Sequence, residues 1–539
     1  MHNEMLIGVL GGLALFLYGM NLMGIGLQKA AGEKMKRLIE VLTNNRFMGV
    51  LVGAVVTMLI QSSSATTVMV VGFVNAGIMT LTQSIGVIMG ANIGTTITAQ
   101  LIAFKLTDVA PFVIAIGVLI WLVSSKKKHK EIAEILIGFG ILFLGMGMMS
   151  EAMTPLKDNE AFRNIMANLK NPFLGILGGF AITAIVQSSS ATTGMLLALA
   201  SAGLVSDVGA VLPILFGQNI GTCVTAMISS IGASKTAKRA AFMHLTFNVL
   251  GTAIFMLLLV ILPIPQWLEM SAQGDIPRQI ANAHSAFNIV NTVLLFPFAN
   301  WIVALAEKVI RGKDEAVEGL KYIDPRIIET PSIAVVMASK EVLRMGKIVN
   351  ESLKRSKNAV INLDEKDIEY VLTKEKYINS LEREIIQYIS QLINAPLTDH
   401  QHVVVTTLLN AVNDMERVAD HAENIVELAQ YRIDNKVKIS QSALDELENM
   451  FNDVEKAYTT SLKAFKLADL ATAEEVFEYE DSIDRLEKAY RSNHIKRLNE
   501  KSCSPTAGIV FLDTISNLER VGDHSSNIAE AVLEGLKKS

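Results

Sequence analysis

The heptapeptide Gln61-Ser62-Ser63-Ser64-Ala65-Thr66-Thr67 recurs letter for letter at Gln187-Ser188-Ser189-Ser190-Ala191-Thr192-Thr193. Each copy interrupts an apolar stretch, and no Asp, Glu, Lys or Arg occurs from residue 47 to residue 104. Hydroxyls and amides lose their water in hydrocarbon, so one such tract is either a helix-packing seam or a binding site. Two copies at equivalent places in a duplicated domain favour the binding site.

The charged residues divide the chain into two parts. The 539 residues have a mean hydropathy of +0.37, yet residues 313–539 are dense in charges of both signs. We therefore expect a membrane domain over residues 1–310, a linker over 311–330 and a water-soluble domain over 331–539. The net charge of −5 comes without a large basic block, so no nucleic-acid partner is indicated. Cys223 and Cys503 fall in different domains and cannot form a disulfide framework, which fits a reducing cytosol.

Seven apolar segments are candidates to cross a bilayer as helices, for which roughly 20 residues are needed. They are Leu6 to Leu27, Gln83 to Phe104, Val109 to Val123, Ile132 to Met153, Val208 to Ser230, Ala240 to Leu262 and Ile280 to Ala306. The run from Val109 to Val123 is short and needs its flanks. The first segment has no basic leader or cleavage site, so we interpret it as a retained membrane helix.

Shorter apolar segments flank both polar tracts. Phe47 to Ile60 and Ala65 to Ala76 would each form roughly 20 Å of helix, and Phe173 to Val186 and Ala191 to Ala202 repeat the pattern. We interpret each pair as a re-entrant hairpin with the QSSS turn at its tip, because unwound backbone survives at membrane depth only where it is buried or lines a cavity. The alternative is one long helix with a polar stripe.

Three basic loops fall on one side of the membrane in this topology. They lie at residues 29–37, 126–130 and 235–239. The positive-inside rule then places these loops and the C-terminal domain in the cytoplasm of a multi-pass protein of the plasma (inner) membrane.

The duplication extends well beyond the heptapeptide. LGGLALFLYGM from Leu10 matches LIGFGILFLGM from Leu136, and the GANIGTT stretch that starts at Gly90 matches GQNIGTC from Gly217. We place repeat 1 at about 6–124 and repeat 2 at about 131–262, followed by an extra helix at 280–306. Three crossings separate equivalent points, so the halves are predicted to be inverted, with the two tips meeting near the midplane.

The tips suit an anion bound together with a cation. A helix that restarts after the serines exposes N–H groups and the positive end of its dipole, which favour an anion such as phosphate. No Lys or Arg in the hairpins can neutralise a divalent charge, so sodium held by neutral oxygens is the expected partner. The phosphate candidates are Ser62, Ser63, Ser64, Ser188, Ser189, Ser190, Gln61 and Gln187. The sodium candidates are Gln61, Gln187, Asn92, Asn219, Thr66, Thr192, Thr95 and Thr222. The alternative for Asn92 and Asn219 is helix capping or cross-linking.

A further pair of motifs places His244 and Asn248, and likewise His284 and Asn288, one helical turn apart. Interhelical hydrogen bonding is the favoured interpretation of these residues.

These residues resemble a known family. QSSSATT twice, G-x-N-I-G-T after each copy, an L-F-L run closing in G-M at the start of each half and a later H-x-x-F-N are similar to the type II sodium/phosphate cotransporters, over about Leu6 to Ile310. The resemblance implies sodium-driven phosphate import, with the serines of both hairpins near phosphate. Ala65 and Ala191 depart from members that have Thr or Ser there.

After Asp324-Pro325 the sequence predicts six amphipathic helices, folded most simply as two three-helix bundles. Their expected bounds are Pro331 to Ala359, Leu363 to Ile393, Asp399 to Asp434, Ser440 to Leu467, Ala471 to Asn499 and Pro505 to Lys538. The fold class is therefore all-α throughout.

A second repeat lies in this half, where MERVADHAENI from Met415 matches LERVGDHSSNI from Leu518. Like charges one turn apart repel, so Glu416 and Asp420, and Glu519 and Asp523, need compensation. A multivalent metal would supply it, with Glu375, Glu480 and Asp484 nearby; the alternative is ion pairing with Arg417 and Arg520. The repeat resembles the PhoU family of phosphate-regulatory proteins, over about Ile333 to Leu536, which implies iron-type metals at the four residues of the E-x-x-x-D motifs.

The combined interpretation is a sodium-coupled phosphate symporter with a cytosolic PhoU-like regulatory module. A phosphate-sensing membrane receptor without net transport is the alternative. We expect no enzyme, since no nucleophile–base set or nucleotide loop occurs. Phosphate, sodium and the lipid bilayer are the expected partners, with a second copy of the chain or a regulatory protein as a further partner of the cytoplasmic domain.

Overall fold

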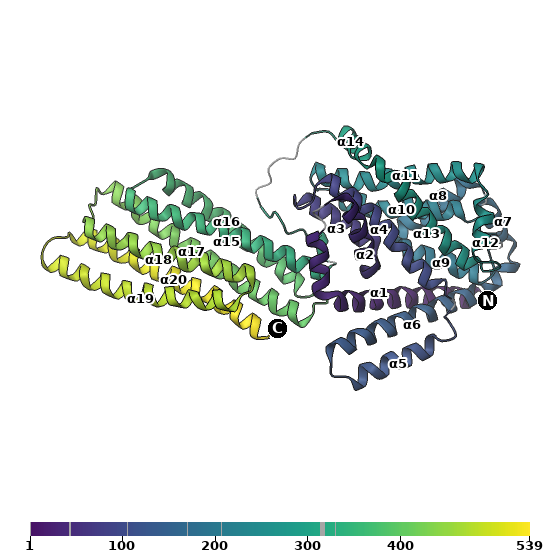
Figure 1. Cartoon of the computed structure of the whole chain (residues 1–539), viewed down its shortest axis with the longest axis horizontal. Coiled ribbons are helices and arrows are strands. Elements are labelled where there is room, and N and C mark those ends of the chain that lie inside the picture. The colour runs from purple at the N-terminus through teal and green to yellow at the C-terminus, as the bar shows by residue number, and fades with distance from the viewer. Residues whose placement is uncertain are drawn as a thin grey trace. The chain divides into compact units, whose positions relative to one another are not determined.

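The computed structural model describes residues 2–41, 45–104, 106–169, 171–205, 207–312, 319–328 and 330–538. Over these ranges the chain forms helices and no strand, which confirms the predicted all-α fold. The chain divides into two compact units, Met1–Ala316 and Val317–Ser539 (Figure 1).

The first unit is a closely packed set of apolar helices. Its elements are α1 (His2–Val41), α2 (Arg46–Ile60), α3 (Ser63–Asn75), α4 (Leu81–Ile102), α5 (Ala110–Val123), α6 (Lys127–Met153), α7 (Glu160–Leu169), α8 (Pro172–Val186), α9 (Ser189–Ser201), α10 (Leu212–Ser229), α11 (Lys235–Ile261), α12 (Ile264–Ser271), α13 (Ile276–Leu295) and α14 (Ala299–Val309). Short 3-10 turns lie at Thr154–Asp158 and Phe296–Phe298.

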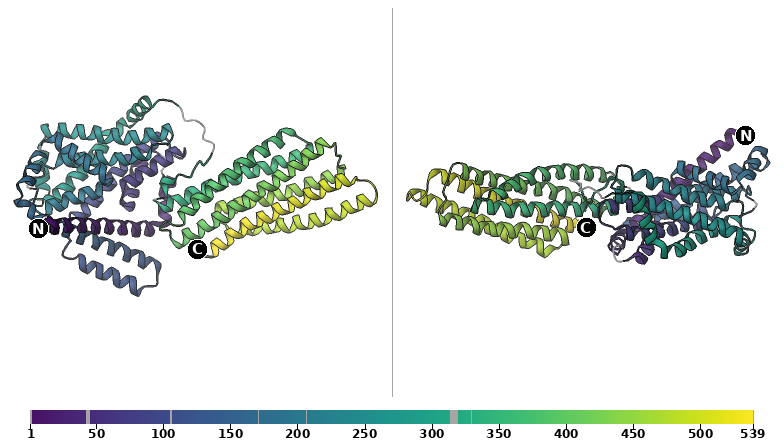
Figure 2. Two further views of the ribbon diagram at one scale, coloured as in Figure 1. Left: turned by 180° about the vertical axis from the view of Figure 1, so that it is seen from behind. Right: turned by 90° about the horizontal axis from the view of Figure 1, so that it is seen from above.

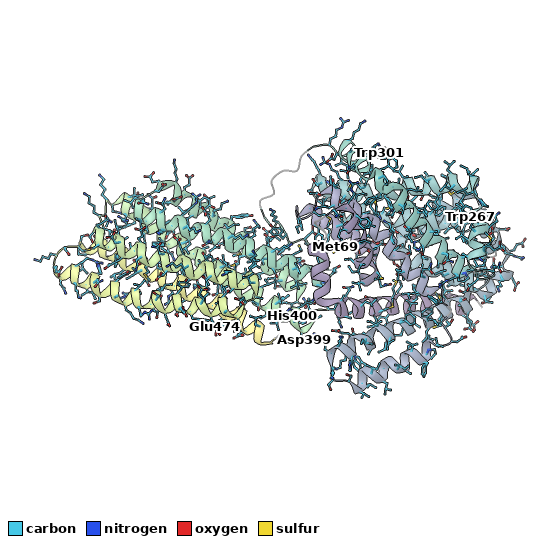
Figure 3. The ribbon with its side chains drawn as sticks, viewed as in Figure 1. Met69, Trp267, Trp301, Asp399, His400 and Glu474 are labelled. Carbon is cyan, nitrogen blue, oxygen red and sulfur yellow. The ribbon has the colours of Figure 1, made fainter. Side chains whose placement is uncertain are left out.

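Six helical segments in the described ranges are long and apolar enough to cross a membrane. They are Glu4–Ala31, Leu81–Ile102, Lys127–Asp158, Leu212–Ser229, Lys235–Ile261 and Ile276–Val309. Exposed tryptophans on α12 and α14, Trp267 and Trp301, are residues typical of membrane–water interfaces (Figure 3).

Two expectations from the sequence need correction. The segment Val109 to Val123 is the 14-residue helix α5, which is shorter than a full span. The segment Ile280 to Ala306 is not one helix, because a 3-10 turn at Pro297 separates α13 from α14; proline cannot donate the backbone hydrogen bond that a continuous helix requires. The helices α7 and α12 were not predicted.

Glycines bring the helices of each half into close contact. A Cβ atom on Gly90 of α4 would lie 2.0 Å from the carbonyl oxygen of Val50 on α2. The equivalent Gly217 of α10 lies against α8 in the same way, 2.1 Å from the carbonyl oxygen of Ile176. Small residues at such contacts are typical of membrane helix packing, and here they fix each N-I-G-T helix against its hairpin.

The second unit is a bundle of long helices (Figure 2). They are α15 (Pro331–Asn362), α16 (Glu365–Leu392), α17 (Asp399–Asp434), α18 (Gln441–Leu467), α19 (Leu470–Asn499) and α20 (Pro505–Lys538), preceded by a 3-10 turn at Pro325–Ile327. The helices α15 to α17 pack on one another, as do α18 to α20, and α17 packs along α20. The two E-x-x-x-D motifs therefore lie on the two helices at the centre of the bundle.

Candidate functional site

Both QSSS tracts break the helix at the same residue and in the same way. Gln61 ends α2 with left-handed backbone, φ 59°, and Gln187 ends α8 with φ 58°. Ser62 and Ser188 are extended, and their hydroxyl oxygens accept hydrogen bonds from the backbone N–H groups of Ala65 and Ala191. Each tract is therefore a helix end followed by a capped helix start, and the continuous-helix alternative is wrong.

The two tips lie in contact with each other. The Ser64 hydroxyl donates a hydrogen bond of 3.4 Å to the carbonyl oxygen of Gln187. Ser63, Ser64, Ser189 and Ser190 are all buried. The N-terminal ends of α3 and α9 thus meet inside the first unit, where neither helix carries a charged side chain.

Buried threonines hold each hairpin together just behind its tip. Thr57 of α2 donates a hydrogen bond of 2.9 Å to Thr66 of α3, and Thr183 and Thr192 are joined over 3.0 Å in the second hairpin. Thr66 and Thr192 in turn donate to the carbonyl oxygens of the capping serines. Thr57 and Thr183 were not predicted as site residues. Each lies four residues before the tip glutamine, on the side of its helix that contacts the second helix of the hairpin.

The two glutamines have different surroundings. Gln61 is 5% exposed and its side-chain oxygen accepts a hydrogen bond of 2.8 Å from Thr98 of α4. Gln187 is exposed, and the equivalent Thr225 has a buried hydroxyl without a partner in the described part of the chain. The sequence analysis also missed Thr98, which follows Thr95 by one helical turn. The first tip glutamine is thus buried against α4 and the second is exposed, although Thr193 of the second hairpin donates a hydrogen bond to Gln218 of α10.

The asparagines of the two N-I-G-T motifs are buried on α4 and α10. Asn92 donates to the carbonyl oxygen of Ile88, and Asn219 donates to that of Leu215. Both amide nitrogens are thus satisfied within their own helices, which leaves the side-chain oxygens as the groups able to face a ligand. Of the threonine candidates on these helices, Thr222 donates to the Gln218 carbonyl, while the Thr95 hydroxyl is buried without a partner among the described residues.

The histidine–asparagine pairs lie on α11 and α13 and are fully or almost fully buried. Asn248 bonds across to Cys223 of α10, as the packing interpretation expects. Neither ring nitrogen of His244 has a hydrogen-bond partner among the residues described, and the same holds for the side-chain oxygens of Asn248 and Asn288. Packing alone therefore does not account for these polar atoms.

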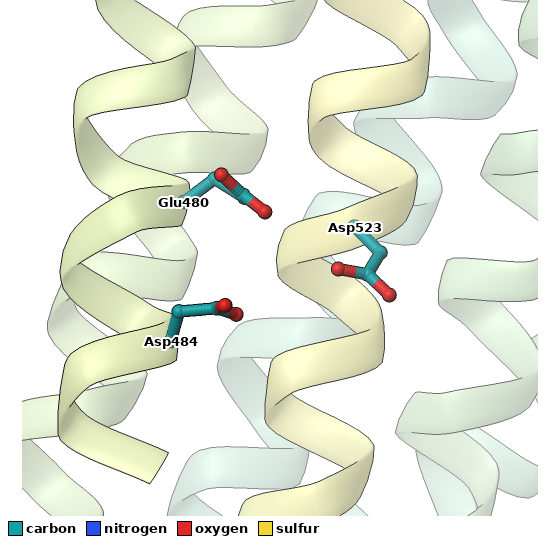
Figure 4. Close-up of side chains that lie close together, drawn as sticks. All are labelled: Glu480, Asp484 and Asp523. Atoms are coloured by element: carbon teal, nitrogen blue, oxygen red, sulfur yellow. The ribbon is translucent and has the colours of Figure 1, made fainter. Parts of the chain in front are cut away.

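The second unit contains a cluster of carboxylates between α19 and α20. Glu480, Asp484 and Asp523 offer oxygens that all lie within 4.8 Å of one another (Figure 4). Burial, followed by the negative charges around it, raises the pKa of Glu480, and the pKa of the adjacent Glu519 is raised for the same reasons. Arg520 lies 3.6 Å from both Glu519 and Asp523 but is largely exposed, so it compensates this charge only weakly.

The first E-x-x-x-D motif has a similar environment on α17. Burial and then the charge of Asp420 raise the pKa of Glu416, and burial raises the pKa of Asp420 itself. Glu375 of α16 and Glu423 also have raised pKa values, with burial as the first cause. The two motifs thus define two acidic clusters related by the internal repeat, and the one at α19–α20 is the more tightly gathered.

Two histidines that follow these motifs stack between α17 and α20. The rings of His421 and His524 lie 5.6 Å apart at 24°. The Nδ1 atom of His421 donates to Asn517, and the Nδ1 atom of His524 donates to Asp414. This reciprocal contact, which the sequence analysis did not assign, joins the two repeats of the unit.

Broken helices whose ends meet inside an apolar unit define the class of polytopic membrane transporters. Comparison with known proteins agrees. The model of the Na+/Pi-cotransporter family matches residues 15–151 and again 145–264, and the PhoU domain model matches 342–429 and 447–532. The chain belongs to the Na+/Pi-cotransporter family and carries PhoU domains in its C-terminal part.

Relatives of different lengths share parts or all of this organisation. YjbB of Salmonella typhimurium, named as a proposed inorganic phosphate export protein, is 24% identical over 98% of this chain and 97% of its own length. YqeW of Bacillus subtilis is 31% identical over 55% of this chain and 96% of its own. The sodium-dependent phosphate transport protein 2A of Ovis aries is 34% identical over 33% of this chain and 30% of its own. The chain is thus a multi-pass membrane protein of phosphate transport.

Proposed function

We propose that the membrane domain, residues 1–310, imports inorganic phosphate coupled to sodium. The observation that carries this proposal is the meeting of the two QSSS tips, with Ser64 bonded to the backbone of Gln187. Two helix starts converge there, and each favours a negative charge. The family name and the name of the sheep relative both support sodium as the co-substrate.

Phosphate is proposed to lie among the tip serines. Ser62 and Ser188 use their oxygens as caps but keep their O–H groups as donors. Ser63, Ser64, Ser189 and Ser190 add four more hydroxyls. Gln61 and Gln187, which terminate α2 and α8, supply amide groups at the rim of the same space.

Sodium is proposed to lie behind the tips, on neutral oxygens of the hairpins and of α4 and α10. The proposed ligands are Gln61, Gln187, Asn92, Asn219, Thr66, Thr192, Thr95 and Thr222. Because these helices carry no acidic or basic side chain except Arg46, at the end of α2 opposite its tip, a divalent anion at the tips would be left uncompensated without such a cation. Phosphate and sodium would then be transported together, because the bound anion needs the positive charge of the cation.

The two halves, at about residues 6–124 and 131–262, are proposed to be inverted repeats that open in turn. The burial of Gln61 and the exposure of Gln187 support this, since alternating access requires equivalent elements to differ at any one moment.

Purified protein in proteoliposomes loaded with or without sodium tests the coupling. Labelled phosphate should accumulate above equilibrium under an inward sodium gradient and leave under an outward one. Equilibration independent of the gradient would refute coupling, and saturable binding without flux would instead identify a phosphate receptor.

Export is the second candidate, because the relative that matches along the full chain is named for it. Cells expressing the chain and preloaded with labelled phosphate separate the two directions: net loss on induction indicates export, and net gain from the medium indicates import.

The chain is proposed to reside in the plasma (inner) membrane with residues 331–539 in the cytoplasm. The two cysteines offer a direct test, since Cys223 is buried and Cys503 is partly exposed. A membrane-impermeant maleimide should label Cys503 in inside-out vesicles and leave it unlabelled in intact cells. The reverse result would overturn this orientation.

The PhoU domains are proposed to regulate transport and to bind a multivalent metal of the iron type at Glu416, Asp420, Glu519 and Asp523. Asp523, one of these four residues, has a carboxylate oxygen within 4.8 Å of those of Glu480 and Asp484, a group that suits a hard cation. Burial first, and then the like-charge repulsion that such a cation would relieve, raises the pKa of Glu480 and of Glu519. Metal analysis of the purified protein, with and without a chelator, tests this part.

A further inference from the structure

We infer that Thr252 and Asn248 of α11 complete a binding site for a small monovalent cation at Asn219 of α10. This inference rests on the proposed sodium coupling and adds ligands from a helix outside the repeated QSSS and N-I-G-T motifs. Its starting point is a group of buried polar atoms that the helix packing leaves without partners.

The register between α10 and α11 is fixed by two contacts. Asn248 of α11 bonds to Cys223 of α10 over 3.3 Å, and the rings of Phe255 and Phe216 lie 5.8 Å apart. Between these two contacts the residue number rises by seven on α11 and falls by seven on α10, as expected for antiparallel helices. Thr252, four residues after Asn248, therefore lies opposite Asn219, four residues before Cys223.

Two of the oxygens brought to this place by the register lack a partner. The Thr252 hydroxyl and the Asn248 side-chain oxygen are buried and make no hydrogen bond within the described ranges. The amide nitrogen of Asn219 bonds to its own helix, so that its oxygen is the free end of the side chain. Buried oxygens of this kind are expected to hold a water molecule or an ion.

The charge of the surroundings selects the ion. No Asp, Glu, Lys or Arg occurs on α10, or on α11 after Arg239; the one histidine there, His244, precedes Asn248 by one helical turn. A divalent cation would have no negative charge to offset its desolvation, whereas amide and hydroxyl oxygens suit a hard monovalent cation such as sodium.

A related arrangement lies between α13 and α4. The helix α13 packs along α4, where Thr292 donates to the Met89 carbonyl oxygen and Gln100 donates to Ser285. Asn288 lies between these contacts, and its side-chain oxygen is again buried without a partner in the part of the chain described. The likeness is partial, because Thr292, which follows Asn288 by four residues as Thr252 follows Asn248, already donates its hydroxyl to Met89.

The test is sodium-dependent thermal stabilisation of the purified full-length protein, in phosphate-free buffer with choline as the replacement cation. Thr252→Val removes one oxygen and keeps the shape of the side chain. We expect the sodium concentration for half-maximal stabilisation to rise roughly tenfold or more, since contacts to a charged group exceed neutral hydrogen bonds. Without sodium, the melting temperature of T252V should equal or exceed that of the wild type, because the lost hydroxyl had no partner.

Matched variants complete the test. Thr252→Ser keeps the hydroxyl and should respond to sodium like the wild type. Thr246→Val on the same helix removes a hydroxyl that already donates to the Phe242 carbonyl, and it should also leave the sodium response unchanged. If T252V does not fold, Asn248→Ala takes its place in the test, and its sodium concentration for half-maximal stabilisation should likewise rise roughly tenfold or more.

A T252V protein with a wild-type sodium response would overturn this inference and leave sodium-coupled transport intact. A wild-type protein that carries phosphate but shows no stabilisation by sodium would overturn both, and the proteoliposome assay identifies that case.

Discussion

Neutralising Glu480 should stabilise the metal-free second unit, because its carboxylate lies beside two further carboxylates. Its oxygens lie within 4.8 Å of those of Asp484 and Asp523. Two unit charges at that separation repel by about 0.9 kcal/mol in a water-like dielectric and by about 3.5 kcal/mol at an effective dielectric of 20. The three residues are partly exposed, so the lower figure is the better guide. We expect Glu480→Gln to raise the free energy of unfolding by about 1 to 2 kcal/mol.

For a unit of this size, that gain corresponds to a rise of about 2 to 8 °C in melting temperature. Calorimetry of the full-length protein after chelation measures it, with Glu478→Gln, an exposed carboxylate on the same helix, as the matched control. Addition of metal should reverse the order, since the wild type gains stability from binding and E480Q loses a candidate ligand. A chelated E480Q protein that melts below the wild type would show that Glu480 forms a favourable structural contact, and would refute the repulsion argument.

Three further predictions concern the two units. Replacing Ser63 or Ser189 singly by Ala should weaken phosphate affinity by about 1.5 to 3 kcal/mol for a hydrogen bond to a charged ligand, measured as the phosphate dependence of uptake; unchanged affinity in both variants would remove the serines from the site. Thr98→Val should lower the free energy of unfolding by about 0.5 to 1.5 kcal/mol, because the hydrogen bond to Gln61 is lost. Thr225→Val should leave the free energy of unfolding unchanged or raise it, because that hydroxyl has no partner among the described residues. Equal effects of the two variants on thermal stability would contradict the different surroundings of the two glutamines. The folded state raises the pKa values of four carboxyl groups, those of Glu416, Asp420, Glu480 and Glu519, and therefore binds more protons than the unfolded state. The chelated protein should lose stability as the pH rises from about 4 through those pKa values. Calorimetric melting temperatures that rise over this range would contradict the raised pKa values.

The helix breaks could be predicted from the sequence because each is a property of a few adjacent residues. Polar QSSS letters between apolar segments too short to span are enough to indicate a break at residue 61 and at residue 187. The interruption at Pro297 had an equally local signal, but the surrounding apolar run from Ile280 hid it. The six helices of the second unit followed from their amphipathic periods in the same way.

The partners behind the tips could not be predicted, because they depend on which helices pack together. Thr57 and Thr98 reach the first tip from different helices, and no pattern in the sequence distinguishes them from other buried threonines. The acidic cluster is different in this respect: Glu480 and Asp484 were expected to lie near Asp523, and the structure brings the three together between α19 and α20. The different exposure of Gln61 and Gln187 could not be predicted either, since the six residues that follow each glutamine are identical and the residues before both are apolar apart from one threonine.

Because Gln61 is buried and Gln187 is exposed, each copy of the heptapeptide can serve as an internal control for the other. Identical side chains on matching backbone turns are buried at residue 61 and exposed at residue 187 within one molecule, so any reagent that reads the exposure of one glutamine has a counterpart at the other. Under alternating access, a full transport stroke would exchange the two settings. A single pair of probes at residues 61 and 187 would then report the stroke as two opposite signals of similar size.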